Sequence, residues 1–326
     1  MAGNKNKTKR FLLIVLVFLI FLLVSVFVAA AFLLYTNNTD EKVGVIPLMR
    51  KSVPELTNFA ILGVVGDGTR TEMIVVGSFN SVSGAVNIIS IPRDTYVQMP
   101  EERLDILRAE GGWAPDDGVM KINEVYGLAG KKNGIGVAVA QLEELLGIKI
   151  DYRAKVDLTA FRHIVDAIGG VEFNVPQRIY YNNPEQNLYI DLYPGIQILN
   201  GEQAECLVLY RISDKENAIS SGYDEDDVQR VKMQQEFIRE FISQAISNQS
   251  LWSTSGALVT TIFKYVETDF GIIDATKYVG SVKGFSSSNI NFETLPSDVT
   301  DINGQSFVIK REPDASQMIE NIFGQH

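Results

Sequence analysis

Positively charged side chains follow the ends of predicted strands in this sequence. Arg93 comes just after the apolar stretch 86–91, Arg211 directly follows the apolar stretch 206–210, and Lys121 opens a predicted helix. A guanidinium group can bind two phosphate oxygens at once, which suits a pyrophosphate. Several such groups, in a chain with a formal net charge of −11, fit a localised anion site.

A further arginine lies on the predicted helix 226–247. Asp227, Arg230 and Gln234 are spaced i, i+3 and i+7, which places them on one face of that helix. Arg230 is therefore another candidate for the anion site. Each arginine could equally form an ordinary surface ion pair with an aspartate, and composition alone does not choose between these interpretations.

Other familiar catalytic sets are absent from the sequence. It contains two histidines: His326 is the last residue, and His163 lies in a predicted helix where a structural role is expected. No Ser/His/Asp set can be built from one usable histidine. The sequence also has no Cys/His metal cluster, no Walker-type phosphate loop and no dinucleotide glycine pattern. The single cysteine, Cys206, lies among small and apolar residues, which predicts packing.

Five stretches in a fixed order resemble the LytR-CpsA-Psr family, across roughly residues 58–245. They are Ile91-Pro92-Arg93-Asp94-Thr95-Tyr96-Val97, Lys121-Ile122-Asn123-Glu124-Val125-Tyr126, Val156-Asp157-Leu158-Thr159 with Ile168-Gly169-Gly170, Ile190-Asp191-Leu192 with Leu199-Asn200-Gly201, and Asp227 through Arg230 to Gln234. The resemblance implies a phosphotransferase that moves a glycopolymer of teichoic-acid or capsule type from undecaprenyl diphosphate onto peptidoglycan. An older description of the family is transcriptional attenuator.

The resemblance also implies roles for individual residues. The pyrophosphate would be bound by Arg93, Arg211, Arg230 and Gln234, with Lys121 near it. Such a set is physically sensible, because phosphoryl transfer mainly needs positioning and neutralisation of oxygen charge. Arg93 would be catalytic together with two acids that hold Mg²⁺ or take the proton of the acceptor hydroxyl.

At the acidic positions the sequence departs from the family pattern. The first acid of the pattern is replaced by Val65, so Asp67 is the nearest candidate, and Glu72 stands where an aspartate is usual. Ser213 and Met233 occupy two further arginine positions. Two alternatives to catalysis follow: a divergent binder or sensor of polyprenyl diphosphate lipids, and an anchored envelope-binding domain whose arginines are structural.

These residues need a scaffold, and hydrophobic periodicity predicts an α/β fold with a mixed central sheet sandwiched between helical layers. Strands are predicted at 59–65, 73–79, 86–91, 152–156, 171–175 and 206–210 and around Phe292 and Val308, and helices at 134–146, from Asp157 onward and at 226–247. The strands 73–79 and 86–91 form a predicted hairpin. Residues 56–326 are expected to form one extracytoplasmic domain.

Apolar residues of this scaffold have two possible uses. They could line a tunnel for the polyprenyl chain, with the arginines at its mouth, or they could pack against each other. The residues concerned belong to strands 73–79 and 86–91 and include Ile135, Val139, Leu142, Phe161, Ile164 and Val165.

The N-terminus predicts attachment to a membrane. Residues 1–10 contain four basic residues and no acid, and residues 11–35 form an almost wholly apolar segment long enough to cross a bilayer. By the positive-inside rule, the tail 1–10 is cytoplasmic and the stalk 36–55 and the domain 56–326 are extracellular, in a Gram-positive-type envelope. A cleaved signal peptide ending near 29–31 is the alternative. The acidic remainder argues against nucleic acid as a partner.

Overall fold

The computed structural model divides into two compact units, which we describe separately. The sheet unit comprises Lys42–Asp157 and Val266–His326, and the ribbon unit comprises Met1–Glu41 and Leu158–Tyr265. The structure describes residues 53–64, 70–109, 111, 113–183, 188–209, 233, 236, 237, 240, 241, 243, 244, 261, 264–271, 274, 277, 278, 281 and 287–324. The single domain 56–326 expected from the sequence stays a prediction.

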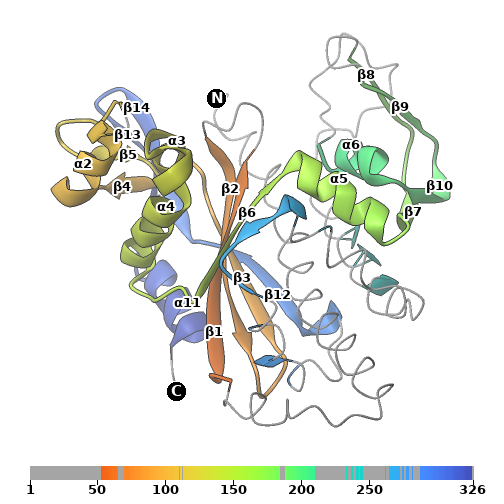
Figure 1. The fold of residues 1–326 in the computed structure, drawn as a ribbon, viewed down its shortest axis with the longest axis horizontal. Coiled ribbons are helices and arrows are strands. Elements are labelled where there is room, and N and C mark those ends of the chain that lie inside the picture. Colours follow the sequence, from red (N-terminus) through yellow and green to blue (C-terminus); the bar gives the residue numbers. More distant parts are fainter. Residues whose placement is uncertain are drawn as a thin grey trace. The chain divides into compact units, whose positions relative to one another are not determined.

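A mixed sheet with the strand order β11-β6-β1-β2-β3-β12 forms the centre of the sheet unit (Figure 1). Its strands are β1 Leu56–Val64, β2 Thr71–Asn80, β3 Val86–Ile91, β6 Tyr152–Asp157, β11 Glu267–Thr268 and β12 Ile290–Thr294. β1 is parallel to β6, β3 is parallel to β12, and β2 runs antiparallel between β1 and β3. The carboxyl ends of β1, β3, β6 and β12 therefore lie at the same edge of the sheet.

The hairpin of β2 and β3 confirms the sequence prediction. Asn80 shapes the turn, because its side-chain Oδ1 accepts hydrogen bonds from the backbone N–H groups of Val82 at 2.9 Å and Ser83 at 2.8 Å. Gly84 completes the turn with a φ of 71°, which a residue with a Cβ adopts at a cost. The resulting register pairs Ile74 with Ile91, so the start of β2 lies beside the end of β3.

Helices cover one face of this sheet. They are α3 Ile122–Leu128, α4 Gly130–Leu146 and α11 Asp314–Phe323, and α2 Glu101–Ala109 packs against α4. Alternate residues of the strands, such as Leu62 and Ile74, form one buried core with Val125 of α3, Leu142 of α4 and Ile322 of α11. Two short ribbons complete the unit: β4 Tyr96–Gln98 with β5 Val119–Lys121, and β13 Ser297–Ile302 with β14 Gln305–Lys310.

The opposite face of the sheet packs against aromatic side chains from the second chain segment of the unit. The Tyr278 ring lies 6.0 Å from Phe79, and the Tyr278 hydroxyl and the Thr57 hydroxyl share a hydrogen bond of 2.9 Å. Phe270 stacks edge-on against Tyr152 at 4.7 Å. Residues 274, 277 and 278 are helical. The structure therefore confirms a mixed central sheet with helices, which is the coarser part of the expected fold.

The ribbon unit combines helices with two antiparallel ribbons. It contains α5 Leu158–Ala167, β7 Val171–Val175, β8 Ile179–Asn183, β9 Leu188–Leu192, β10 Gly195–Leu199 and α6 Gly201–Leu209. β7 pairs with β10, and β8 pairs with β9. Phe161, Phe173 and Phe237 are buried in this unit, and the rings of the last two lie 5.4 Å apart.

The strand predicted for residues 206–210 is wrong, because residues up to Leu209 belong to helix α6. Asn200 caps this helix: its Oδ1 accepts from the backbone N–H of Gln203 at 2.9 Å, and the Gln203 Oε1 accepts from the backbone N–H of Asn200 at 3.0 Å. A short apolar run is compatible with a buried strand or a buried helix, so the cap was the better signal. The described chain before Arg211 is therefore helical up to Leu209.

The expected apolar tunnel stays a prediction. Ile135, Val139 and Leu142 are buried in the core of the sheet unit, and Phe161 and Ile164 are buried in the ribbon unit.

The expected membrane segment lies outside the described residues, as do the tail 1–10 and most of the stalk 36–55. Within the part of the chain that the structure describes, no helix is long and apolar enough to cross a membrane.

Candidate active site

The turn after β3 carries Arg93, the first residue expected to bind pyrophosphate. The backbone N–H of Thr95 donates to the Pro92 carbonyl at 2.9 Å, and the Thr95 hydroxyl donates to the same carbonyl at 2.5 Å. The turn is also bonded to the start of α3. The backbone N–H of Ile122 donates to the Thr95 carbonyl at 2.9 Å, and that of Asn123 donates to the Arg93 carbonyl at 3.2 Å. These bonds bring two motifs that are distant in sequence together.

Asp94 joins the two cations that meet at this point. Its Oδ2 lies 3.5 Å from Arg93 Nε, and its Oδ1 lies 3.4 Å from Lys121 Nζ. The three side chains are 20–26% exposed, so they are partly shielded from water but open to a ligand. We call Arg93, Asp94 and Lys121 the cationic cluster. With two positive charges and one negative charge, it keeps a net charge of +1 with which to attract an anion.

The cationic cluster rests on the ribbon of β13 and β14. The backbone N–H of Val308 donates to the Asp94 carbonyl at 2.9 Å, and Lys121 Nζ lies 5.7 Å from the centre of the Phe307 ring. Sequence reasoning named Arg93 and Lys121 but gave Asp94 no role. The sequence did place Asp94 directly after Arg93, which could have pointed to its role. A carboxylate that binds both cations fixes the distance between Arg93 and Lys121.

Of the two predicted acids, the backbone of Glu72 lies at the same edge of the sheet. Glu72 is the second residue of β2, whose first residue, Thr71, pairs with Val64 at the end of β1. The Thr71 hydroxyl donates to the Asn123 carbonyl at 3.3 Å, which connects this strand to the start of α3. The side chain of Glu72 and all of Asp67 lie outside the described residues. Among the described side chains, no group of three or more His, Cys, Asp or Glu residues could hold a metal ion.

Asn123 is a further residue of this edge that sequence reasoning did not single out. It is 3% exposed, and its side-chain Oδ1 has no hydrogen-bond partner among the described residues. A buried amide oxygen without a partner is destabilising, and native proteins keep few of them. The Asn123 backbone bonds to both Arg93 and Thr71, so this residue lies next to the turn that carries Arg93 and next to the start of β2.

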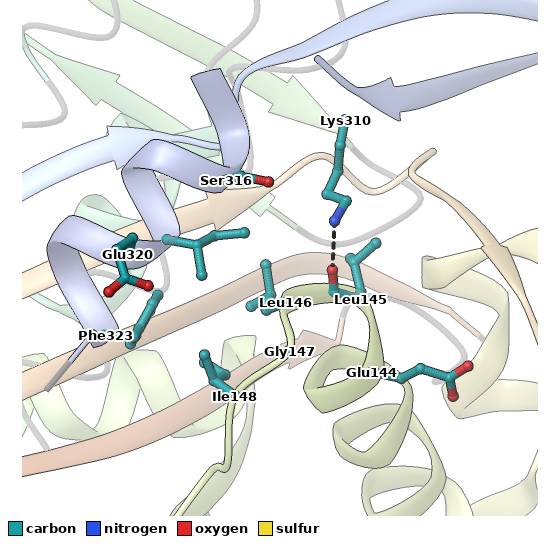
Figure 2. A pocket seen from close by; sticks show the side chains of 11 residues that line it. Glu144, Leu145, Leu146, Gly147, Ile148, Lys310, Ser316, Glu320 and Phe323 are labelled. Carbon is teal, nitrogen blue, oxygen red and sulfur yellow. Dashed lines mark hydrogen bonds between the residues drawn. The ribbon is translucent and has the colours of Figure 1, made fainter. Parts of the chain in front are cut away.

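A cavity of about 440 Å³ lies elsewhere in the sheet unit, between the end of α4 and α11 (Figure 2). Its one cation, Lys310, donates to the Leu145 carbonyl at 3.0 Å and lies 3.6 Å from Glu312. Glu144 and Glu320 also line the cavity. Because its cation is engaged and its other charges are negative, this cavity does not suit a diphosphate.

Comparison with known proteins agrees with the order of motifs and the mixed sheet. A model of the LytR_cpsA_psr family matches residues 23–323 of the sequence. The chain belongs to this family.

Among the family relatives is the polyisoprenyl-teichoic acid–peptidoglycan teichoic acid transferase TagU of Bacillus mycoides. It is 28% identical over 203 residues, which cover 62% of this chain and 56% of TagU. The TagU of Oceanobacillus iheyensis is 25% identical, with 83% of this chain and 76% of the relative covered. Biofilm regulatory protein A of Streptococcus mutans is 25% identical, with 79% of this chain and 59% of the relative covered. The chain thus spans about half to three quarters of the length of these relatives.

Solved structures show that the chain has the fold of the LytR_cpsA_psr family. The crystal structure of B. subtilis TagV aligns with a TM-score of 0.59 and 19% identity, covering 82% of this chain and 96% of TagV. A structure of TagT bound to LIIa-WTA aligns with a TM-score of 0.57 and 19% identity, covering 85% of this chain and 95% of TagT.

The remaining residues that the family resemblance assigns to the pyrophosphate lie outside the described residues. These are Arg211, Arg230 and Gln234, so their convergence with Arg93 stays a prediction. Met233, which replaces an arginine of the family pattern, is 3% exposed. This family member therefore uses position 233 for packing.

The two side chains that were expected to be structural are placed accordingly. His163 is half-buried and stacks on Tyr265 with ring centres 3.9 Å apart. Cys206 is 5% exposed, and burial raises the pKa of its thiol to about 12. A buried thiol that stays protonated is a poor nucleophile, which supports packing as its role.

Proposed function

We propose that this protein transfers a phosphate-linked glycopolymer of teichoic-acid type from polyisoprenyl diphosphate to peptidoglycan. The observation that carries the proposal is the cationic cluster, in which β3 and α3 bring Arg93 and Lys121 onto one carboxylate of Asp94. Family membership supports the same conclusion, because several relatives are named polyisoprenyl-teichoic acid–peptidoglycan teichoic acid transferases. Undecaprenyl diphosphate would carry the polymer, and a capsule-type polymer is the other possible cargo.

The reaction replaces a phosphoanhydride bond of the lipid diphosphate with a phosphoester bond to the acceptor. A hydroxyl of the peptidoglycan glycan attacks the phosphorus that carries the polymer, and the bond from that phosphorus to the bridging oxygen of the diphosphate breaks. The polyprenyl phosphate leaves with the electron pair, and the hydroxyl proton passes to a base. Arg93 and Lys121 neutralise the diphosphate oxygens while charge develops on the leaving phosphate.

The proposed metal ligands or catalytic bases are Glu72 and Asp67. Glu72 belongs to the strand that begins beside the end of β3, so its backbone lies near the cationic cluster. We propose that these two acids bind Mg²⁺ or accept the hydroxyl proton, as the family resemblance implies. A bound Mg²⁺ would supply positive charge that screens the diphosphate.

A binder or sensor of polyprenyl diphosphate lipids is the second candidate function. It is favoured by Val65, which replaces the first acid of the family pattern, and by the buried Met233, which replaces an arginine. Such a protein would bind the lipid diphosphate through the cationic cluster but would not transfer a polymer.

A transfer assay separates the two functions. The full chain in detergent is mixed with a lipid-linked labelled polymer and with peptidoglycan, and insoluble label is measured. We expect transfer that Arg93→Ala reduces about a hundredfold, because a charge-assisted contact is lost. Arg108→Ala is the matched control, since Arg108 forms surface pairs with Glu101 and Asp105 on α2. Lipid binding without transfer under any condition, including added Mg²⁺, would support the sensor instead.

We also propose that residues 11–35 anchor the protein in the cell membrane with the described units outside the cell. The basic tail and the apolar segment of the sequence support this orientation. Ser52→Cys should react with an impermeant thiol reagent on intact cells, and the buried Cys206 should remain silent. Labelling only after lysis would reject the orientation.

A further inference from the structure

The ribbon of β8 and β9 has two different faces. Residues that pair across an antiparallel ribbon share a face, and successive pairs alternate between faces. Ile179 pairs with Leu192, and both are buried. The next pair, Tyr180 and Asp191, therefore lies on the outer face. Tyr189 is two positions before Asp191 and shares that face.

An ion pair holds the aromatic side chains of the outer face in place. Arg178 binds Asp191 through two hydrogen bonds of 2.7 Å, from Nε and Nη2 to the two carboxylate oxygens. The same guanidinium lies 4.8 Å from the Tyr193 ring centre and 5.8 Å from that of Tyr180. Tyr180 and Tyr189 meet edge-to-face at 5.8 Å. We call Arg178, Tyr180, Tyr189, Asp191 and Tyr193 the tyrosine face.

The tyrosine face presents large rings to solvent. Tyr189 is 63% exposed and Tyr193 is 59% exposed, although Tyr189 packs against Tyr180 and Tyr193 packs against Arg178. Exposed aromatic rings that are held in position provide contact area at a low cost in side-chain entropy, and they are typical of binding surfaces. On the opposite face, Ile179 and Leu192 are buried, so the described packing of the ribbon does not depend on these tyrosines.

Charge restricts the occupant of this face. The hydrogen bond to Arg178 holds the pKa of Asp191 below its usual range, so both members of the pair remain charged and cancel each other. A neutral face within a chain of net charge −11 disfavours a polyanion such as a phosphate-containing polymer. An uncharged chain of sugar rings suits it better, because a sugar has an apolar C–H face for a tyrosine ring and hydroxyl and amide groups for polar side chains.

Surfaces that insert into a membrane combine aromatic rings with aliphatic side chains. The described side chains of the tyrosine face include none. The exposed isoleucines of this unit, Ile196 and Ile198, belong to β10 of the neighbouring ribbon, opposite Asn174 and Glu172. Substitutions on the two ribbons can therefore distinguish sugar binding by the tyrosine face from apolar contact by the isoleucines of β10.

We propose that the tyrosine face binds the glycan strand of peptidoglycan, with sugar rings stacked on Tyr189 and Tyr193 and with sugar polar groups bonded to the tyrosine hydroxyls and the Arg178–Asp191 pair. The inference rests on the proposed function, in which peptidoglycan is the acceptor. It adds the surface that recognises this acceptor.

Binding to sacculi tests the inference without any donor lipid. The full chain in detergent is sedimented with peptidoglycan sacculi from which acid has removed the phosphate-linked polymers. We expect Tyr189→Ala/Tyr193→Ala to weaken binding about tenfold or more, because two stacking contacts are lost. Tyr189→Phe/Tyr193→Phe keeps both rings but loses the hydroxyl contacts, so it should bind more weakly than the native chain and more tightly than the double alanine variant. Ile196→Ser/Ile198→Ser, the control on the neighbouring ribbon, should bind like the native chain.

The outcomes separate this inference from the proposed function. Unchanged binding by the double alanine variant, with circular dichroism and melting temperature also unchanged, would overturn the tyrosine face as the glycan site. Equal loss of binding in the isoleucine variant would overturn it as well. Tyrosine-dependent binding by a chain that never transfers polymer would reject the proposed function and leave the inference standing.

Discussion

The cationic cluster and the tyrosine face differ in burial and in charge. The cluster is partly buried and carries a net positive charge, and the turn after β3 that carries Arg93 and Asp94 is hydrogen-bonded to the start of α3. The tyrosine face is exposed and neutral, and side-chain packing holds it together. A reacting diphosphate needs charge in a fixed position, whereas a long neutral glycan needs an open surface. We therefore expect the donor diphosphate and the acceptor glycan to be bound by two regions with different electrostatics.

The comparison predicts its largest effect at Arg93. Arg93→Ala removes a charge-assisted contact of roughly 1.5–3 kcal/mol, so the affinity for a polyprenyl diphosphate should fall by a factor of about ten to more than a hundred. The tyrosine variants should leave this affinity unchanged. Titration of the detergent-solubilised full chain with the lipid checks both statements. Equal losses from both kinds of variant would show that the two regions do not have separate ligands.

A smaller effect is expected at Asp94, which joins the two cations. Asp94→Asn raises the local charge from +1 to +2 but removes the group that spaces Arg93 and Lys121. We expect diphosphate binding to tighten a few-fold at low salt and the transfer rate to fall about tenfold. Single-turnover kinetics at two salt concentrations measures both quantities. A parallel fall in affinity and rate would mean that Asp94 contacts the ligand itself.

Asn123 allows a test of stability beside the same cluster. Asn123→Leu replaces a buried amide whose oxygen lacks a partner among the described residues, so the free energy of unfolding should rise by about 1 kcal/mol. Transfer should fall at the same time, because a hydrogen-bond acceptor beside the turn that carries Arg93 is lost. Urea unfolding and the transfer assay provide the two measurements. A loss of stability would instead assign Asn123 a structural hydrogen bond.

The smallest expected effect concerns Cys206, in the core of the ribbon unit and not on its surface. Burial raises the pKa of Cys206 to about 12, above that of an unfolded thiol. The stability that Cys206 contributes is therefore complete at neutral pH and is lost as the pH rises from about 9 toward 12. Cys206→Ala should flatten this part of the pH profile of unfolding. Rapid alkylation of native Cys206 at pH 8 would contradict the assignment.

The elements with clear periodicity were predictable from the sequence. The hairpin of β2 and β3, the strand β6 and the helix α4 all have an apolar pattern that agrees with their burial. The apolar run 206–210 was misassigned because a short run without polar positions has no period to read. Its Asn200 cap was the missing signal.

The candidate site was predictable only in part. Arg93 and Lys121 were found because charged residues after apolar segments stand out. Asp94 and Asn123 were missed because their roles depend on contacts between segments that are far apart in the sequence. The tyrosine face depends on the register of β8 with β9, which the sequence of either strand does not contain.

Photo-crosslinking tests the central claim most directly. A polyprenyl diphosphate that carries a photoreactive group next to the diphosphate is bound to the full chain and irradiated, and the modified peptides are identified by mass spectrometry. The account predicts modification within residues 92–95 and 121–123, lost in Arg93→Ala and retained in Arg108→Ala. Modification confined to the cavity between α4 and α11, or unchanged by Arg93→Ala, would contradict it.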